Sequence, residues 1–293
     1  MIHQHPRFYV GGDRYIEVEL GDGMSFELNI LVHNLVAAIR QAAIPGIIEL
    51  IPELASMQIS YDPEVIRYAD VVREVGALHD GASRIDAAEL PSRMFYIPVM
   101  YFDPWTEACI EDYRSRQPDK QPDAQLVCQA NGLPGRDALR RLHAGTDYWV
   151  AALGFWPGLC SLMPLDDRAR IVAPKYNPPR TWTPRGAVGL GGALTCIYPD
   201  RTPGGYQLLG RTPVPTFDRE QRLPAFHDDI VLFRPGDRVR FIPIDQAEFE
   251  FLESEVEAGR YEHHCVEHQT FSVGRYREAR RRLEAGQPAG GSA

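Results

Sequence analysis

The sequence predicts an α+β protein in which a small α+β N-terminal domain precedes a β-barrel domain and a C-terminal extension. Between residues 7 and 101, β-forming runs with period-two alternation flank segments with helical spacing, which is typical of a small α+β sandwich. From residue 148 onward, short β-type runs separated by frequent Gly and Pro favour a barrel. We expect domains at 1–101, 102–245 (with a helical insertion) and 246–293 (helix, strand, helix and a disordered tail).

The N-terminal domain begins with two strands over residues 7–20, where β-formers alternate with charge on either side of Gly11-Gly12. Residues 31–43 have apolar side chains at helical spacing, and Pro45-Gly46 ends that helix. Two Asp-Pro pairs place an N-cap residue before a proline at the first helical position. These pairs predict helices from Asp62 to about 79 and from Asp103 to about 116, and further strands are expected at 25–29, 47–52, 56–61 and 95–101.

The barrel domain is preceded by a polar, proline-rich stretch at 117–123, which we expect to be an exposed loop. Two short helices are expected next, at 123–130 and 135–144, and residues 230–243 are expected to form a closing hairpin around Pro235-Gly236-Asp237. The remaining expected elements are helices at 246–258 and 275–285, strands at 148–154, 193–198, 206–209 and 262–272, and disorder at 287–293.

Composition limits the class of function. Hydrophobic residues make up 44% of the chain and charged residues 24%, as in globular proteins. The net charge of −9 argues against a nucleic-acid partner, because phosphate binding needs a clustered basic face. No apolar run is long enough for a membrane helix, and the N-terminus has no signal-peptide pattern. The five cysteines are scattered without CxxC spacing, so we expect a cytoplasmic protein.

Residues 173–212 combine turn-forming residues with polar side chains at the edges of the turns. A proline-stiffened turn at 175–180 contains Lys, Tyr, Asn and Arg, and glycine-marked turns follow at 189–192 and 203–206. Glycine allows a ligand or another backbone to approach closely, and proline restricts the free loop. The pattern is also consistent with ordinary barrel corners.

The motifs of this stretch resemble the carboxyltransferase domain of urea carboxylase, in the half shared with the first subunit of allophanate hydrolase and the B subunit of 5-oxoprolinase. They are KYNPPRTWTP, GAVGLGGA, CIY, PGGYQ and GRT, in this order. GGDRYIEVELGDG and SMQISYDP resemble the family's N-terminal part, YWVAALGFWPGL resembles the hydrolase-subunit branch, and HQTFSVGRY resembles the urea carboxylase branch. The resemblance covers roughly residues 8–280, and different segments resemble different branches of the family.

The resemblance implies a cyclophilin-like barrel and an enzyme that is complete only with other chains. It implies a homologous second carboxyltransferase half on another chain, similar to the second subunit of allophanate hydrolase, together with a biotin carrier and a biotin carboxylase. The sequence has no Met-Lys-Met biotin-attachment motif and no glycine-rich ATP-binding loop. We therefore expect biotin to be carried on another chain and ATP to act only on a partner, with no membrane partner.

The chemistry that the resemblance implies assigns roles to residues of this stretch. Transfer of a carboxyl group from carboxybiotin to a urea or amide nitrogen needs cations, oxyanion donors and a base. Lys175 and Arg180 can hold a carboxylate and Asn177 can orient an amide, so these three are the expected catalytic residues. Expected substrate or biotin contacts are Tyr176, Gly191, Gly192, Gly204, Gly205, Tyr206, Gln207 and Arg211, although Arg211 also fits a bracing role.

Other polar groups favour structural roles. On a strand, His263 and Cys265 face one side and His264 and His268 the other, so we expect no metal site. His143 lies at an expected helix end, where a cap or core role is typical.

Three functions remain open on the sequence alone. The leading hypothesis is one subunit of a heteromeric, biotin-dependent carboxyltransferase acting on urea or a related amide-like compound. The second is one subunit of an ATP-dependent lactam or amide hydrolase resembling 5-oxoprolinase, which the GFWPG corner supports. The third is a regulatory binder similar to the histidine-kinase inhibitors of this family.

Overall fold

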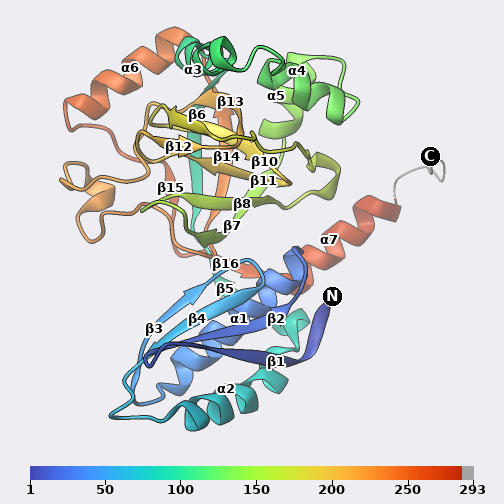
Figure 1. Cartoon of the computed structure of the whole chain (residues 1–293), viewed down its shortest axis with the longest axis vertical. Helices are drawn as coiled ribbons and strands as arrows, with labels where there is room; N and C mark the ends of the chain where they lie inside the picture. The colour runs from blue at the N-terminus through green and yellow to red at the C-terminus, as the bar shows by residue number, and fades with distance from the viewer. Residues whose placement is uncertain (286–293) are drawn as a thin grey trace. The chain divides into compact units, whose positions relative to one another are not determined.

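The computed structural model describes residues 1–285 and divides them into two compact units, residues 1–92 with 268–285 and residues 93–267 (Figure 1). The α+β class with a cyclophilin-like barrel, expected from the sequence, is confirmed. The units differ from the expected domain ranges at both ends of the barrel. The strand at 94–101 is hydrogen-bonded within the barrel, and the segment after 246 is shared between the two units.

The first unit is built on a four-stranded antiparallel sheet in the order β1-β2-β4-β3, with the helices α1 and α2 packed together. Along the central strands, apolar side chains such as Ile16, Val18 and Met57 alternate with more exposed ones, as expected for a sheet with one buried face. Its elements are β1 (Ile2–Gly11), β2 (Tyr15–Gly21), α1 (Phe26–Ala42), β3 (Ile47–Pro52), β4 (Ser56–Tyr61), α2 (Tyr68–Ala82), β5 (Glu89–Pro91), β16 (Thr270–Ser272) and α7 (Val273–Ala285).

Two expectations for the first unit were wrong because short polar residues cap helices as well as turns. The strand expected at 25–29 is the first turn of α1, where the Ser25 hydroxyl accepts a hydrogen bond from the Leu28 N–H at 3.1 Å. The helix expected from Asp62 begins at Tyr68. Asp62 caps only an isolated turn, in which its carboxylate accepts from the Glu64 N–H at 3.0 Å.

The second unit is a closed barrel of seven strands in the order β13-β10-β11-β8-β7-β14-β6, which closes where β6 pairs with β13. Its interior is filled by apolar side chains from every side, including Val150, Leu162, Val188 and Phe241. The strands are β6 (Met94–Tyr101), β7 (Asp147–Leu153), β8 (Cys160–Pro164), β10 (Ala187–Gly191), β11 (Leu194–Ile197), β13 (Gln207–Arg211) and β14 (Arg238–Pro243), with β15 (Cys265–Val266) added at β6 and a separate pair, β9 (Arg180–Thr183) and β12 (Thr202–Gly204).

The closing hairpin expected at 230–243 does not form. β14 pairs in parallel with β6 and antiparallel with β7, whereas Val231 makes an isolated bridge with Phe217. Similarly, the strand expected at 262–272 is two short strands, β15 and β16, which belong to different units. The disorder expected at 287–293 lies outside the described residues.

The helices expected in the barrel unit are confirmed: α3 (Pro104–Arg116), α4 (Asp123–Ala130), α5 (Arg136–Ala144) and α6 (Gln246–Glu257). Asp103 caps α3, because its carboxylate accepts from the N–H groups of Trp105 and Thr106 at 3.0 and 2.9 Å. These helices gather at one end of the barrel in Figure 1. Among residues 1–285, none of the helices combines the length and the apolar character that crossing a bilayer requires.

Candidate functional site

The polar turn at 173–180 lies against both glycine-marked turns, so the structure brings most of the expected site residues together in the barrel unit. Ala173 and Gly192 exchange two backbone hydrogen bonds of 2.8 and 2.9 Å. Farther along, the Tyr176 N–H donates to the Gly205 carbonyl at 2.6 Å. The turn is therefore fixed to β10 and to the start of β13 at two points.

Tyr176 is the centre of a group of side chains that we call the Tyr176 cluster; its other members are Tyr113, Lys120, Asp123, Lys175, Arg180, Tyr206 and Gln207. The Tyr176 side chain is buried, and its hydroxyl donates to the Asp123 carboxylate. The Lys120 ammonium and the Arg180 guanidinium lie 4.4 and 4.3 Å from the centre of its ring, and the Tyr113 ring lies 4.7 Å away. Burial and the neighbouring Asp123 charge raise the pKa of Tyr176 well above its usual value, so the hydroxyl stays protonated.

Asp123, the first residue of α4, links this tyrosine to the barrel. It is fully buried and accepts hydrogen bonds from Lys120 Nζ at 2.7 Å and from the Leu208 N–H at 2.6 Å. Lys120 also donates to Gln207 Oε1 at 3.1 Å, and Gln207 Nε2 donates to the Pro174 carbonyl at 2.6 Å. Gln207 is thus buried and occupied by internal partners.

Lys120, Asp123 and Tyr113 are members of the cluster that sequence reasoning missed. The stretch 117–123 was expected to be an exposed loop, but the side chain of Lys120 is only 13% exposed. One signal was available, since Lys120 and Lys175 are the only lysines in the chain.

Arg180 lies at the start of β9 and is 2% exposed. Its Nη1 donates to the Tyr206 carbonyl at 2.6 Å, and its Nη2 donates to Thr183 Oγ1 at 3.2 Å. Within residues 1–285 this guanidinium forms no ion pair, so its charge is balanced only by carbonyl, hydroxyl and ring contacts. A buried cation in this state favours an anion nearby.

Lys175 and Asn177, by contrast, are exposed. The Lys175 ammonium lies 5.2 Å from the centre of the half-buried Tyr206 ring and makes no ion pair in the described part of the chain. Asn177 precedes a cis peptide bond to Pro178. Burial raises the pKa of Tyr206 to about 12, so its hydroxyl is a donor rather than a base at neutral pH.

The glycines of the cluster make room for rings and backbone. A Cβ atom on Gly191 would lie 2.3 Å from Cδ1 of Tyr206, and one on Gly204 would lie 2.6 Å from the Tyr198 hydroxyl. The Gly192 N–H already donates to Ala173, and the Gly205 carbonyl already accepts from Tyr176. The N–H of Gly192, an expected substrate or biotin contact, is therefore occupied by an internal partner.

Arg211 is not part of this cluster. Its Nε donates to the Arg185 carbonyl at 2.9 Å, its Nη2 pairs with Glu253 at 3.2 Å, and its guanidinium lies over Trp105 and Phe249. These contacts match the bracing role that the sequence left open.

The histidines occupy separate environments. His143 is fully buried between the Tyr101 hydroxyl (2.7 Å) and Thr195 Oγ1 (3.0 Å), and burial lowers its pKa to about 3. His263 bonds to the Pro215 carbonyl at 2.8 Å, whereas His264 stacks on Tyr96. In the described ranges, no three His, Cys, Asp or Glu side chains gather as metal ligands would.

Comparison with known proteins identifies a family over most of the chain. The family model described as "Carboxyltransferase domain, subdomain C and D" matches residues 6–227, which includes the whole Tyr176 cluster.

Individual relatives fall into two groups. The chain is 31% identical over 257 residues to the urea amidolyase of Saccharomyces cerevisiae, covering 85% of this chain but only 14% of that protein. It is 31% identical over 241 residues to the 5-oxoprolinase B subunit of Escherichia coli O157:H7, covering 82% of this chain and 97% of that subunit. The crystal structure of Kluyveromyces lactis urea carboxylase is similar over 96% of this chain and 26% of that one, with 26% identity and a TM-score of 0.81.

Proposed function

We propose, on the premise that the chain belongs to the family of carboxyltransferase subdomains C and D, that it is one subunit of a heteromeric, biotin-dependent carboxyltransferase. In this proposal the assembled enzyme moves CO₂ from carboxybiotin to the nitrogen of urea or a related amide-like compound. A homologous second carboxyltransferase half, a biotin carrier and a biotin carboxylase are contributed by other chains, and ATP is used only on a partner.

The observation that carries the proposal is the excess of positive charge around Tyr206. Lys175 lies over its ring and Arg180 bonds to its carbonyl, and neither has a carboxylate partner among the described residues. Two cations without a carboxylate partner, one over the Tyr206 ring and the other at the Tyr206 carbonyl, attract an anionic carboxyl group. Lys120, by contrast, is neutralised by Asp123.

The residues present fit a carboxylated biotin. The accessible part of the Tyr206 ring offers an apolar face for a bicyclic ring, and the exposed Lys175 offers a cation for its carboxylate. When bound, biotin would supply the activated carboxyl group. We infer that Lys175 holds that carboxylate and that Asn177 orients the accepting amide. Arg180 positions Tyr206 through the hydrogen bond to its carbonyl.

The tyrosines of the cluster act as donors and spacers. The raised pKa values of Tyr176 and Tyr206 keep both hydroxyls protonated at neutral pH. Asp123 already accepts three hydrogen bonds, which leaves it poorly placed to take a proton from substrate. We therefore infer that the general base is supplied from outside this cluster.

A second candidate function is that of one subunit in a 5-oxoprolinase-like lactam hydrolase. The nearly complete coverage of the E. coli protein favours it. The similarity to urea carboxylase extends over more of this chain, beyond the segment that the family model matches, and this supports placing the carboxyltransferase first.

The test begins with tagged full-length chain purified from its native source, with co-purifying proteins identified by mass spectrometry and probed with labelled streptavidin. The complex is then supplied with ATP and labelled bicarbonate, with urea in one reaction and 5-oxoproline in another. Urea-dependent label fixation, abolished by avidin, supports the proposal. Avidin-resistant ATP hydrolysis that depends on 5-oxoproline assigns the hydrolase function instead, and a complex inactive with both would favour a regulatory binder.

A further inference from the structure

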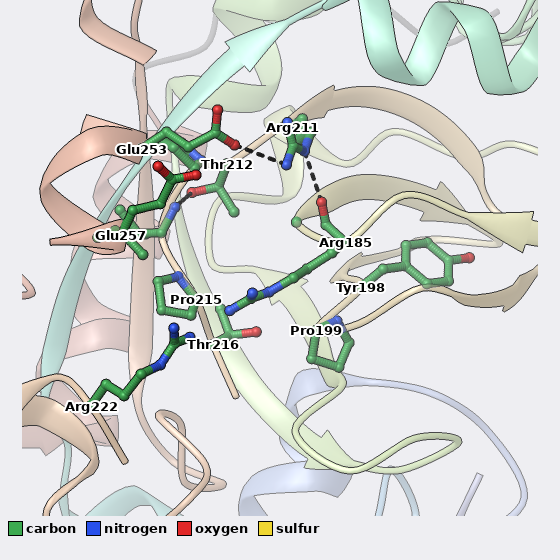
Figure 2. Close-up of a pocket in the computed structure, with 14 residues that line it drawn as sticks. Arg185, Tyr198, Pro199, Arg211, Thr212, Pro215, Thr216, Arg222, Glu253 and Glu257 are labelled. Carbon is green, nitrogen blue, oxygen red and sulfur yellow. Dashed lines mark hydrogen bonds and ion pairs between the residues drawn. The ribbon is translucent and has the colours of Figure 1, made fainter. Parts of the chain in front are cut away.

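A hollow in the barrel unit lies beside Arg211, and none of the Tyr176 cluster residues lines it (Figure 2). Its volume is about 270 Å³, just below the roughly 300–1,000 Å³ that is typical of small-molecule pockets. Its walls come from the turn at 185–186, from the last residue of β13 and the segment 212–216 after it, and from α6. The site therefore suits a small ligand and has a fixed frame.

One wall of the hollow presents a polar group without a partner. The Thr216 side-chain hydroxyl is buried, and no hydrogen bond from residues 1–285 satisfies it. Leaving such a group unpaired is unfavourable, so native structures pair nearly all of them with protein, water or ligand. Because Thr216 lines the hollow, a molecule bound there can provide the missing partner.

The charges on the walls are partly neutralised. Arg211 pairs with Glu253 at 3.2 Å, and Arg222 pairs with Glu220 at 3.3 Å. Within the region that the structure describes, the exposed side chains of Arg185 and Glu257 form no ion pair and no hydrogen bond. Figure 2 shows the Arg185 side chain extending toward Pro215 and Thr216. As far as the described residues go, the walls of the hollow thus hold an unpaired cation, an unpaired anion and a buried, unpaired hydroxyl.

We propose that this hollow binds a small zwitterion of the α-amino acid class. A guanidinium binds a carboxylate through two parallel hydrogen bonds, which assigns the ligand's carboxylate to Arg185. The ligand's ammonium pairs with Glu257, and its side chain or carboxylate reaches Thr216. A simple anion would be repelled by Glu257 and a simple cation by Arg185, so only a ligand with both charges satisfies both walls.

The proposal does not rest on the catalytic function proposed above, and it is tested by binding to the purified full-length chain. The twenty common L-amino acids are screened by thermal shift, and the best ligand is measured by isothermal titration calorimetry. Its N-acetyl derivative and its α-carboxamide, each lacking one charge, are measured alongside. We expect both derivatives to bind at least about tenfold more weakly than the zwitterion.

Variants locate the site. Arg185→Gln and Glu257→Gln should each weaken binding by at least about tenfold, and Thr216→Val by about fivefold, because each removes one ligand contact. Arg219→Gln is the matched control, since Arg219 is an exposed arginine of the same unit that does not line the hollow. Circular dichroism verifies folding of each variant. Binding of no amino acid, equal binding of the derivatives, or unchanged affinity in both charge variants would overturn the proposal.

Discussion

The Tyr176 hydroxyl donates a hydrogen bond to the buried carboxylate of Asp123, and this contact joins the polar turn at 173–180 to the first residue of α4. Asp123 also receives hydrogen bonds from Lys120 and from the backbone of β13. One carboxylate therefore holds three separate segments of the barrel unit in place. Changes at this position should affect both stability and the geometry of the site.

We predict that Asp123→Asn lowers the free energy of unfolding by about 3–5 kcal/mol, because it leaves the Lys120 ammonium without a buried counter-charge. Tyr176→Phe removes one hydrogen bond and should cost about 1–2 kcal/mol. Urea denaturation of the two single variants and the double variant measures their coupling. Effects that add to within about 0.5 kcal/mol would mean that the two side chains act independently.

Gly191→Ala should disturb the site, because the new Cβ would lie 2.3 Å from Cδ1 of Tyr206. We expect a loss of about 1–3 kcal/mol in the free energy of unfolding, from displacement of the ring. Turnover should fall as well, since Tyr206 moves relative to Lys175. Gly205→Ala is the control: its Cβ would meet its nearest neighbour at 3.7 Å, an ordinary contact. Equal tolerance of both changes would contradict this role of Gly191.

Lys175→Met should lower kcat/KM of the reconstituted carboxyltransferase by about tenfold to a hundredfold, through loss of an exposed cation that attracts carboxylate. The residual activity should depend less steeply on ionic strength than that of the unaltered enzyme, because salt screens exposed charges. Arg219→Met removes one positive charge elsewhere on the same unit and should leave both quantities unchanged. The same salt dependence in the Lys175 variant would exclude a direct electrostatic role.

Arg180 combines stability and function. Arg180→Met removes the donor to the Tyr206 carbonyl, and we expect turnover to fall at least about tenfold. Because Arg180 is buried, we expect the free energy of unfolding to fall as well, by about 1–3 kcal/mol. Turnover and urea denaturation measured on the same preparation separate the two effects. Turnover equal to that of the unaltered chain would remove Arg180 from the site.

His143 should make stability depend on pH. Burial lowers its pKa from 6.5 to about 3, so below pH 6.5 the unfolded chain takes up a proton that the folded chain refuses. Stability from this group is therefore complete above pH 6.5 and is lost as pH falls toward 3. Between pH 7 and pH 5 the loss should be about 2 kcal/mol.

The measurement compares urea denaturation of the unaltered chain and of His143→Gln at both pH values. The variant lacks the titrating group, so its stability should fall by about 2 kcal/mol less over this interval. Identical pH dependence of the two proteins would show that His143 is not neutral in the folded state.

Local sequence signals predict many elements of the fold, although the Asp62-Pro63 pair caps only an isolated turn. Asp103-Pro104 marks the start of α3 because both residues act within one turn of the chain. Features set by distant segments were not predicted. The parallel pairing of β14 with β6 joins Arg238 to Met94, and no local pattern specifies that register.

The candidate site was likewise predicted where local motifs mark it and missed where contacts between distant segments form it. The motif stretch identified Lys175, Tyr176, Arg180 and Tyr206, which the structure brings together. Lys120 and Asp123 lie in a polar, proline-rich stretch that is typical of a surface loop, but in the structure both contact Tyr176 and β13. Arg211 belongs to the same motif series but lines the hollow of Figure 2, because β13 shifts register against β10 between Leu208 and Gly210 and so changes the alternation before Arg211.

The first unit is assembled from two segments of chain that the whole barrel separates. β5 pairs with β16, which places Glu89 opposite Ser272, and the Phe26 ring contacts the rings of Phe271 and Tyr276. During synthesis, Phe26 and β5 leave the ribosome long before these partners exist. The N-terminal unit therefore cannot complete its packing around Phe26 until the barrel has been translated. Its completion should follow synthesis of the barrel, and a stalled chain that ends within the barrel should expose Phe26 to chaperones.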